Sequence, residues 1–298
     1  MTSHTWSIII NPHAGRKALS RGDVESAVSK RGLDATISVT ASLEELRATV
    51  NEHARSGVRS YVAVGGDGTA HHIINAIMAT GLTDSERFVL AIVATGSGSD
   101  FVRTFGHRPG LEPGLDRIVM PDLYPIDIGH LEAGFGSRFF LNAANTGVAA
   151  AAALRAEHLP RAMGPRRYTA GFWLELPRFP VRSISLACDR HRFEGEAISV
   201  VVANGQFFGG GMNVAPRATL VDGLFDVQVF RAPKRQAFTV MPRIIRGNHL
   251  THTGVRRYTG GSISISDSSD WPVEADGEYL GRGPVSMTIL PAAIEFVA

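Results

Sequence analysis

The five residues Gly65-Gly66-Asp67-Gly68-Thr69 limit what this chain can fold into more than any other segment. They follow the apolar run 61–64 and precede residues 73–78, whose apolar positions can form one face of a helix. The order predicts a strand, a glycine turn and a helix. Glycine lets another molecule approach the main chain, and N–H groups at a helix N-terminus favour an anion. We interpret the turn as a phosphate site whose aspartate suits a metal ion; a tight turn with an acidic N-cap is the plain alternative.

Composition narrows the class of protein. The 298 residues suffice for one large or two modest domains, and 44% hydrophobic with 19% charged residues is typical of a globular protein. A formal net charge of +2 gives no reason to expect a nucleic-acid partner. Cys188 is the single cysteine, which excludes an internal disulfide and a cysteine zinc cluster. Without a signal-peptide pattern or an apolar run of ~18 residues, we expect a cytoplasmic protein, with peripheral contact at the inner membrane face left open.

Hydrophobic patterning divides the chain near residue 123. Before it, expected strands at 6–10, 35–39, 61–64 and 88–93 alternate with expected helices at 24–30, 43–55 and 67–80. This alternation predicts a parallel sheet, with ligands bound beyond the carboxyl ends of its strands. After it, extended segments punctuated by Gly, Pro and Asp predict an antiparallel β domain with a helical insertion at 149–176 and a short helix at 235–245. We expect domains at 1–123 and 124–290, with 291–298 returning to the first.

Three further turns have the composition of ligand sites. Gly96-Ser97-Gly98-Ser99-Asp100 follows the apolar run 89–93, and Asn11-Pro12-His13-Ala14-Gly15 follows the first expected strand. Asp276-Gly277-Glu278 places two carboxylates around one glycine, a pair suited to general-base chemistry. None is a P-loop or a dinucleotide fingerprint. Taken singly, they also fit a loop, a β-turn and a solvated hairpin.

The four elements in this order resemble those of the diacylglycerol kinase catalytic family, which includes sphingosine and ceramide kinases and bacterial soluble lipid kinases. Residues 65–69 match its GGDGT signature, 11–15 its N-P-x-x-G turn and 276–278 its D-G-E motif. Asp222-Gly223-Leu224 matches its D-G-L turn, and Gly209-Gly210-Gly211 with Pro216 matches the segment before it. The resemblance implies a Rossmann-like α/β nucleotide domain, similar to phosphofructokinase and NAD kinase, and a C-terminal antiparallel β-sandwich-like domain.

The resemblance also implies a function and a set of site residues. It implies transfer of the ATP γ-phosphoryl group to a lipid alcohol, such as diacylglycerol or a sphingoid base, in phospholipid metabolism. The implied catalytic residues are Glu278, Asp276 and Asp127. The implied nucleotide contacts are Asn11, Pro12, His13, Ala14, Gly15, Thr40, Gly65, Gly66, Asp67, Gly68, Thr69, His72, Gly96, Ser97 and Asp100. The implied Mg²⁺ ligands are Asp222, Asp67 and the carbonyls of Thr219 and Leu224.

Several departures from the family pattern leave alternatives open. His71-His72 stands where the family has Asn-Glu, and Ala94, Ser97 and Ser99 stand where it has Pro, Thr and Asn. A catalytically silent lipid-binding or regulatory homologue therefore remains an alternative, as does an NAD kinase-like enzyme. The aromatic segment 168–176, Phe207-Phe208 and the arginines around them fit either a protein core with a solvated face or a lipid contact. The acceptor lipid is left open, and a homodimer is allowed.

Overall fold

The computed structural model describes residues 5–12, 19–82, 87–95, 99–164, 166–231, 233–266 and 270–298. The chain forms two compact units, one of Met1–Ile126 with Ala292–Ala298 and one of Asp127–Pro291. Two long strands, β5 (Leu123–Ala133) and β17 (Val285–Val297), carry the chain from one unit to the other. We call the two units the N-terminal unit and the β unit. Within the described residues, no helix is long and apolar enough to cross a membrane.

The N-terminal unit is built on a parallel sheet. Its strands are β1 (Trp6–Ile10), β2 (Ala35–Val39), β3 (Ser60–Gly65) and β4 (Val89–Ala94). They pair in parallel in the order β4, β3, β1, β2, and the end of β17 adds to β4 through Glu295 and Phe296. Every residue of β1, β3 and β4 is buried, as expected for parallel strands covered on both faces.

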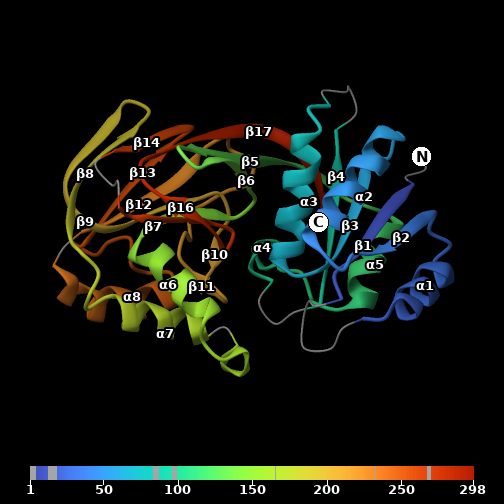
Figure 1. The fold of residues 1–298 in the computed structure, drawn as a ribbon, viewed down its shortest axis with the longest axis horizontal. Coiled ribbons are helices and arrows are strands. Elements are labelled where there is room, and N and C mark those ends of the chain that lie inside the picture. Colours follow the sequence, from blue (N-terminus) through green and yellow to red (C-terminus); the bar gives the residue numbers. More distant parts are fainter. Residues whose placement is uncertain are drawn as a thin grey trace. The chain divides into compact units, whose positions relative to one another are not determined.

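Helices cover both faces of this sheet (Figure 1). They are α1 (Arg21–Lys30), α2 (Leu43–Arg55), α3 (Asp67–Ala79), α4 (Asp100–Thr104) and α5 (Leu111–Val119). Apolar residues of α1 and α5 pack on one face of β1, β3 and β4. On the other face, the hydroxyl of Tyr61 donates to the Val50 carbonyl of α2 at 3.3 Å. Phe101 of α4 packs edge-on against Phe296 at 5.1 Å between ring centroids, which fixes the chain end in this core.

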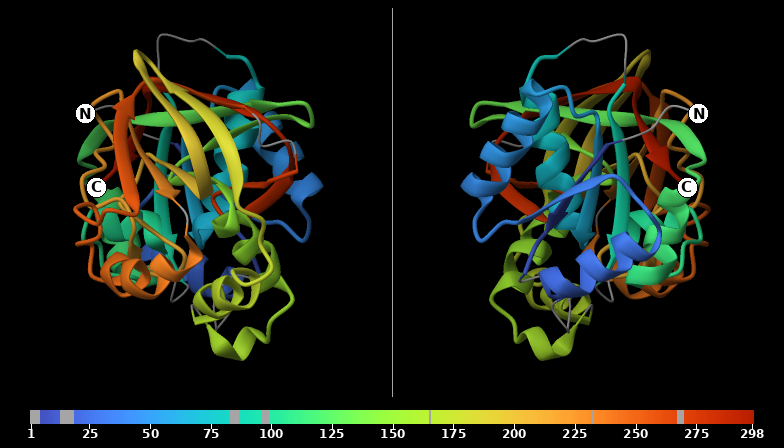
Figure 2. Two further views of the ribbon diagram at one scale, coloured as in Figure 1. Left: turned by 90° about the vertical axis from the view of Figure 1, so that its left-hand side faces the viewer. Right: turned by 90° about the vertical axis from the view of Figure 1, so that its right-hand side faces the viewer.

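The β unit is antiparallel, and most of its strands pack around a large hydrophobic cluster (Figure 2). Its strands beside β5 and β17 are β6 (Gly136–Phe140), β7 (Ala143–Gly147), β8 (Arg182–Cys188), β9 (His191–Ala203), β10 (Phe207–Phe208), β11 (Met212–Asn213), β12 (Phe225–Arg231), β13 (Val255–Gly260), β14 (Ser262–Ser266), β15 (Pro272–Ala275) and β16 (Glu278–Arg282). The thirteen-residue β9 organises them, because it pairs with β8, β7 and β12.

Three helices pack on this unit. They are α6 (Val148–Glu157), α7 (Arg166–Glu175) and α8 (Ala237–Ile245), with single 3₁₀ turns at Arg161–Met163 and Lys234–Gln236. Helices α6 and α7 approach closely at Gly171, where an added Cβ would lie 2.5 Å from the Ala152 carbonyl oxygen. Helix α8 packs against Val201 and Ala203 at the end of β9.

The predicted fold class is confirmed: a parallel α/β unit is followed by an antiparallel β-sandwich-like unit. The expected helix at 43–55 has the observed bounds, and the strands at 6–10 and 35–39 do as well. The single helical insertion expected at 149–176 is two helices, α6 and α7, because the chain turns at residues 158–160. The sequence did not predict strands β5, β7, β10, β11, β13, β15 and β16.

A series of hydrogen-bonded polar side chains lies within the β unit. His249 is fully buried, and its Nε2 atom lies 2.8 Å from Oε1 of Gln228. Gln228 in turn donates to a carboxyl oxygen of Asp226 at 3.1 Å, and Arg257 pairs with the other oxygen at 2.7 Å. Burial lowers the pKa of His249 to about 4, since the imidazolium would lose its hydration.

We expect His249 to make folding sensitive to acid. The unfolded chain binds a proton at His249 below about pH 6.5 and the folded chain only near pH 4, so the free energy of unfolding falls as pH drops through this window. The stability difference between the wild type and His249→Gln should therefore shrink by about 2 to 3 kcal/mol between pH 7.5 and pH 4. Urea denaturation at each pH measures it. A pH-independent difference would contradict the assignment.

Candidate functional site

The predicted strand-end turns of the N-terminal unit meet at one edge of its sheet. Three backbone hydrogen bonds connect the segments just past the strands. Asn11 N–H donates to Val64, Thr40 N–H to Ile10 and Thr95 N–H to Gly65, at 3.0 to 3.1 Å. Because neighbouring parallel strands end together, the carboxyl ends of β1, β2, β3 and β4 lie side by side, with the described residues that directly follow them.

Side chains tie these turns to one another. The Asn11 amide donates to the hydroxyl of Thr69 at 3.2 Å, joining the first turn to the GGDGT turn. The carboxylate of Asp67 accepts the N–H groups of Asp100 at 2.6 Å and Phe101 at 3.3 Å. Helix α4 therefore begins on the carboxylate of another turn, a charge-assisted cap from outside its own segment. Asp100 itself is buried.

Helix α3 begins at the glycine pair of the signature. Its N-cap is Gly66, which has no side chain to accept the N–H groups of the first turn. A Cβ added at Gly66 or Gly68 would meet no atom of the described residues within 4 Å, so these residues leave the space beside this backbone open. An uncapped helix N-terminus beside an open main chain can bind an anion. Gly65 is buried at the end of β3.

Other predicted residues of this unit have different surroundings. Pro12 is half-buried in the turn after β1, and Thr40 is buried after β2. His71 is buried in α3, with Nε2 3.3 Å from the Asn75 amide nitrogen, and its ring meets the half-buried His72 edge-on at 5.4 Å. The predicted contacts at His13, Ala14, Gly15, Gly96 and Ser97 lie outside the described residues.

The D-G-E segment of the β unit is a strained turn held by its own acids. Asp276 and Gly277 both have positive φ, +49° and +88°. The carboxylate of Asp276 accepts the N–H groups of Leu141, Asn142 and Ala143 at 2.7 to 3.1 Å. Its own N–H donates to the Ala143 carbonyl at 2.9 Å. Asp276 therefore joins the turn to the bend between β6 and β7.

Glu274 supports the same turn from inside the hairpin. It is buried, one carboxyl oxygen accepts the Gly277 N–H at 2.7 Å, and the other accepts the side-chain amide of Asn145. Glu278 instead remains half-buried, and one of its carboxyl oxygens lies 3.5 Å from an Arg138 guanidinium nitrogen of β6. Asp276 and Glu274 thus accept hydrogen bonds from backbone N–H groups, whereas Glu278 forms an ion pair.

The D-G-L turn is attached to Asp127 of β5. Asp127 is buried, and its carboxylate accepts the Gly223 N–H at 2.7 Å. Its main-chain N–H donates to Leu220 at 2.7 Å, and its carbonyl accepts the Asn204 amide at 2.8 Å. Asp222 is exposed, with one carboxyl oxygen accepting the Leu224 N–H at 3.1 Å. Oxygen atoms are the ligands that Mg²⁺ prefers, and the predicted ligand set of Asp222 with the carbonyls of Thr219 and Leu224 stays a prediction.

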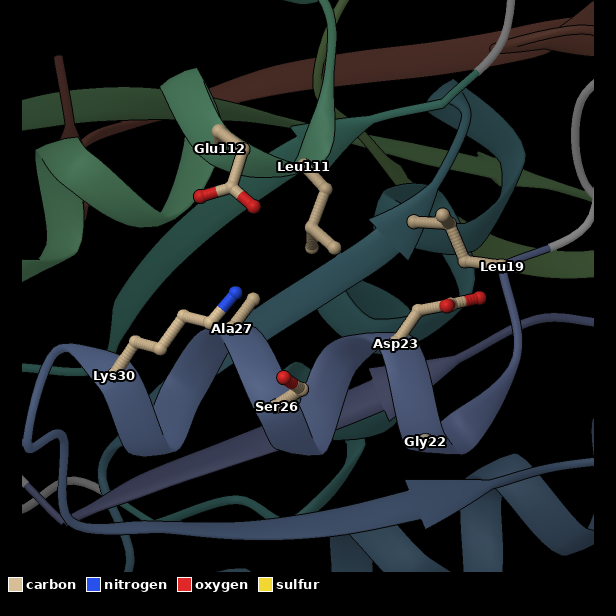
Figure 3. Close-up of a pocket in the computed structure, with 8 residues that line it drawn as sticks. All are labelled: Leu19, Gly22, Asp23, Ser26, Ala27, Lys30, Leu111 and Glu112. Carbon is tan, nitrogen blue, oxygen red and sulfur yellow. The ribbon is translucent and has the colours of Figure 1, made fainter.

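A surface hollow of about 380 Å³ lies elsewhere on the N-terminal unit, between α1 and α5. Figure 3 shows Asp23, Ser26 and Lys30 of α1 facing Leu111 and Glu112 of α5 across it. None of the predicted site residues lines this hollow. Its mixed charges and its lack of predicted site residues give no reason to place the phosphate chemistry there.

Comparison with known families agrees with this geometry. A family model described as the diacylglycerol kinase catalytic domain matches residues 5–131. A second, described as the YegS C-terminal NAD kinase beta sandwich-like domain, matches residues 142–298, more than half of the chain. This chain belongs to the diacylglycerol kinase catalytic family. Membership places it among kinases and implies the use of ATP and of a lipid substrate.

Relatives match along almost the whole chain. A diacylglycerol kinase of Staphylococcus saprophyticus is 29% identical over 295 residues, covering 97% of this chain and 93% of that protein. One of Staphylococcus epidermidis is 26% identical, covering 97% of this chain and 90% of that protein. A structure described as a diacylglycerol kinase from Bacillus anthracis has a TM-score of 0.73 at 20% identity, covering 100% of this chain and 97% of that one. The last likeness shows the shared fold.

Sequence reasoning missed the residues that build the D-G-E turn. Arg138 is 140 positions from Glu278, and no local pattern marks it as an ion-pair partner. Glu274 gave one usable signal, because it stands at the even spacing that places it on the same face of a strand as Asp276 and Glu278. The positive φ of Asp276 breaks that alternation, so the three acids have different partners.

We expect Asp276→Asn to lower the free energy of unfolding by about 1 to 2 kcal/mol. An amide offers one acceptor oxygen, so its NH₂ group would face at least one of the three backbone donors. Urea denaturation measures the change. Asp270→Asn is the matched control, because it breaks only an exposed pair with Arg182 and should change stability by less than about 1 kcal/mol. Equal effects of the two variants would contradict this role.

Proposed function

We propose that this protein is an ATP-dependent lipid kinase that transfers the γ-phosphoryl group of ATP to the hydroxyl of a lipid alcohol, diacylglycerol or a related lipid. The observation that supports it most is the connected set of strand-end turns, in which Asp67 of the GGDGT turn holds the backbone of Asp100 and Phe101. Phosphoryl transfer depends mainly on positioning and on neutralising charge, so a rigid set of turns is a suitable means.

The N-terminal unit supplies the nucleotide contacts in this proposal. Backbone N–H groups at the start of α3 bind phosphate oxygens beside the open main chain of Gly66 and Gly68. Asn11, Thr40 and Thr69 line the neighbouring strand ends, where Asn11 and Thr69 already contact each other. His72, half-buried in the second turn of α3, is the proposed contact that differs most from the family pattern.

The β unit supplies the metal and acceptor chemistry. Asp222, with the carbonyls of Thr219 and Leu224, would hold Mg²⁺ in the turn that Asp127 fixes through Gly223. Asp67 of the N-terminal unit is the second proposed ligand, because a carboxylate in the phosphate turn offers the oxygen atoms that Mg²⁺ prefers. When bound, Mg²⁺ supplies positive charge that offsets the charge of the phosphates.

Glu278 is the proposed general base. The lipid hydroxyl oxygen forms a bond to the γ-phosphorus while the bond from that phosphorus to the β-phosphate oxygen breaks, and Glu278 accepts the hydroxyl proton. ADP leaves with the bonding electrons. Asp276 and Glu274 act as positioning residues, since their carboxylates fix the turn from which Glu278 projects. Arg138 orients the Glu278 carboxylate through their ion pair.

We expect Glu278→Gln to lower kcat by about 10²–10⁴-fold, because the amide cannot accept the hydroxyl proton. Loss of a part-exposed ion pair with Arg138 should change stability by less than about 1 kcal/mol, so the melting temperature should stay close to that of the wild type. Glu132→Gln, at an exposed position of β5, is the matched control. Activity within a few-fold of wild type would remove Glu278 as the base.

We expect Gly68→Ala to lower activity without loss of stability. The added methyl group meets no atom of the described residues within 4 Å and favours the helix, but it occupies the space proposed for phosphate. KM for ATP should rise at least about tenfold, since a single displaced charge-assisted hydrogen bond is worth about 1.5 to 3 kcal/mol. Gly134→Ala, also with open space around it, is the control. An unchanged KM would mean that phosphate does not approach Gly68.

A labelled-ATP screen tests the proposed reaction as a whole. Purified protein with Mg²⁺ is offered diacylglycerol, a sphingoid base, ceramide, an isoprenoid alcohol and NAD in parallel, with Asp67→Ala as the blank. Label in a lipid product supports the lipid kinase and identifies the acceptor class. NAD is included because the model matching residues 142–298 is described as NAD kinase-like. Label in NAD alone, or in no acceptor, would overturn the proposal.

A further inference from the structure

Helix α8 of the β unit has a second apolar stripe that flanks its buried face. Ala237, Val240, Met241 and Ile244 pack into the core, at the i, i+3, i+4 and i+7 spacing of one helix face. Phe238, Pro242 and Ile245 follow the same kind of spacing next to that face and are exposed. The apolar surface of the helix therefore extends beyond the part that the core covers.

This second stripe is large for an exposed surface. Phe238 is 68% exposed and Ile245 is 53% exposed. The Phe238 ring meets that of Trp173 in α7 with 4.9 Å between centroids, and Leu174 beside it is 46% exposed. Figure 1 shows α7 and α8 next to one another at one end of the β unit. Contiguous exposed apolar side chains, rather than scattered ones, mark contact surfaces.

Positive charge surrounds the stripe without any acid close in sequence. Residues 227–266 contain no Asp or Glu. Arg235, Arg243 and Arg246 are exposed, and in the part of the chain that the structure describes none of their guanidinium groups forms an ion pair. We call Phe238, Pro242, Ile245, Arg235, Arg243 and Arg246 together the α8 face.

We propose that the α8 face docks on the surface of an anionic lipid bilayer. Aromatic and aliphatic side chains enter the boundary between headgroups and acyl chains, while arginines on the same helix pair with lipid phosphates and keep their charge in the headgroup layer. A juxtamembrane arginine adds about fivefold to binding at a negatively charged surface. This inference extends the proposed lipid kinase function, because an acceptor lipid resides in such a bilayer.

A second copy of the chain fits this face less well. A two-fold symmetric contact would place the three arginines of one copy against those of the other, with no acid on the face to separate them. A polyanionic partner with no apolar region would pair with the arginines but would leave Phe238 and Ile245 exposed to water. An anionic bilayer satisfies both halves of the surface.

Vesicle co-sedimentation tests the docking. Vesicles of phosphatidylcholine with phosphatidylglycerol are compared with pure phosphatidylcholine vesicles. The triple variant R235Q/R243Q/R246Q should bind the anionic vesicles about 100-fold more weakly than wild type, from about fivefold per arginine. F238S/I245S should lose at least about tenfold, since it removes the apolar insertion but keeps the charge.

Charge removal at the other end of β9 is the control. Arg190 and Arg192 of the β8–β9 hairpin are exposed and form no ion pair within the described residues. R190Q/R192Q should retain anionic vesicle binding within a few-fold, whereas two fivefold losses would weaken binding about 25-fold if net charge alone decided it. Melting temperatures of all variants establish that each is folded.

The outcomes separate docking from its rivals and from the proposed reaction. Wild-type vesicle binding by both α8 variants, or an equal loss in the control, overturns the proposal. Conversion of a dimer to a monomer by F238S/I245S, with vesicle binding unchanged, assigns the face to a second copy instead. Activity on a short-chain, water-dispersed lipid alcohol is measured in parallel. Vesicle binding without phosphorylation of any lipid would overturn the kinase proposal and support the docking. Phosphorylation without α8-dependent vesicle binding would support the kinase proposal and overturn the docking.

Discussion

The strand-end turns of the N-terminal unit depend on one interaction, in which the carboxylate of Asp67 accepts backbone N–H groups of α4. Helix α4 has only five residues, too few to persist by its own hydrogen bonds. It begins where Asp67 accepts two of its first N–H groups, and those groups come from a segment 33 positions away. One side chain thus fixes the position of the GGDGT turn against the turn after β4. The residue that we propose as a metal ligand is therefore also the cap of helix α4.

The β unit uses acids in the same way. Asp276 and Glu274 each bind backbone N–H groups around the D-G-E turn, and Asp127 binds the N–H of Gly223 in the D-G-L turn. Such carboxylates are partly removed from water, and the backbone donors offset this because hydrogen bonds to a charged acceptor are about twice as strong as neutral ones. Strained positions such as Asp276, with φ of +49°, persist when their surroundings fix them in this manner.

Local patterns predicted what local forces decide. Strands β1, β2 and β3 and helix α2 have strong periodicity and clear caps, such as Ser42 accepting the Glu45 N–H, and the sequence locates them well. Strand β7 reads Ala-Ala-Asn-Thr-Gly and has no β pattern, since pairing with β9 and β15 forms it. The adjacency of the strand-end turns followed from parallel order. The contacts of Asp276, Glu274 and Arg138 join residues far apart in sequence, which no spacing rule can pair.

The two histidines after the signature turn differ in what they mean for activity. His71 is buried, with its ring nitrogen beside the Asn75 amide one helical turn later, so it contributes to the packing of α3. A residue on the buried face of a helix affects the stability of the fold more than it affects the surface that a nucleotide could contact. His72 is half-buried and contacts the edge of the His71 ring. For the proposed kinase we therefore expect the departure at His72 to affect activity more than the departure at His71, which packs within α3.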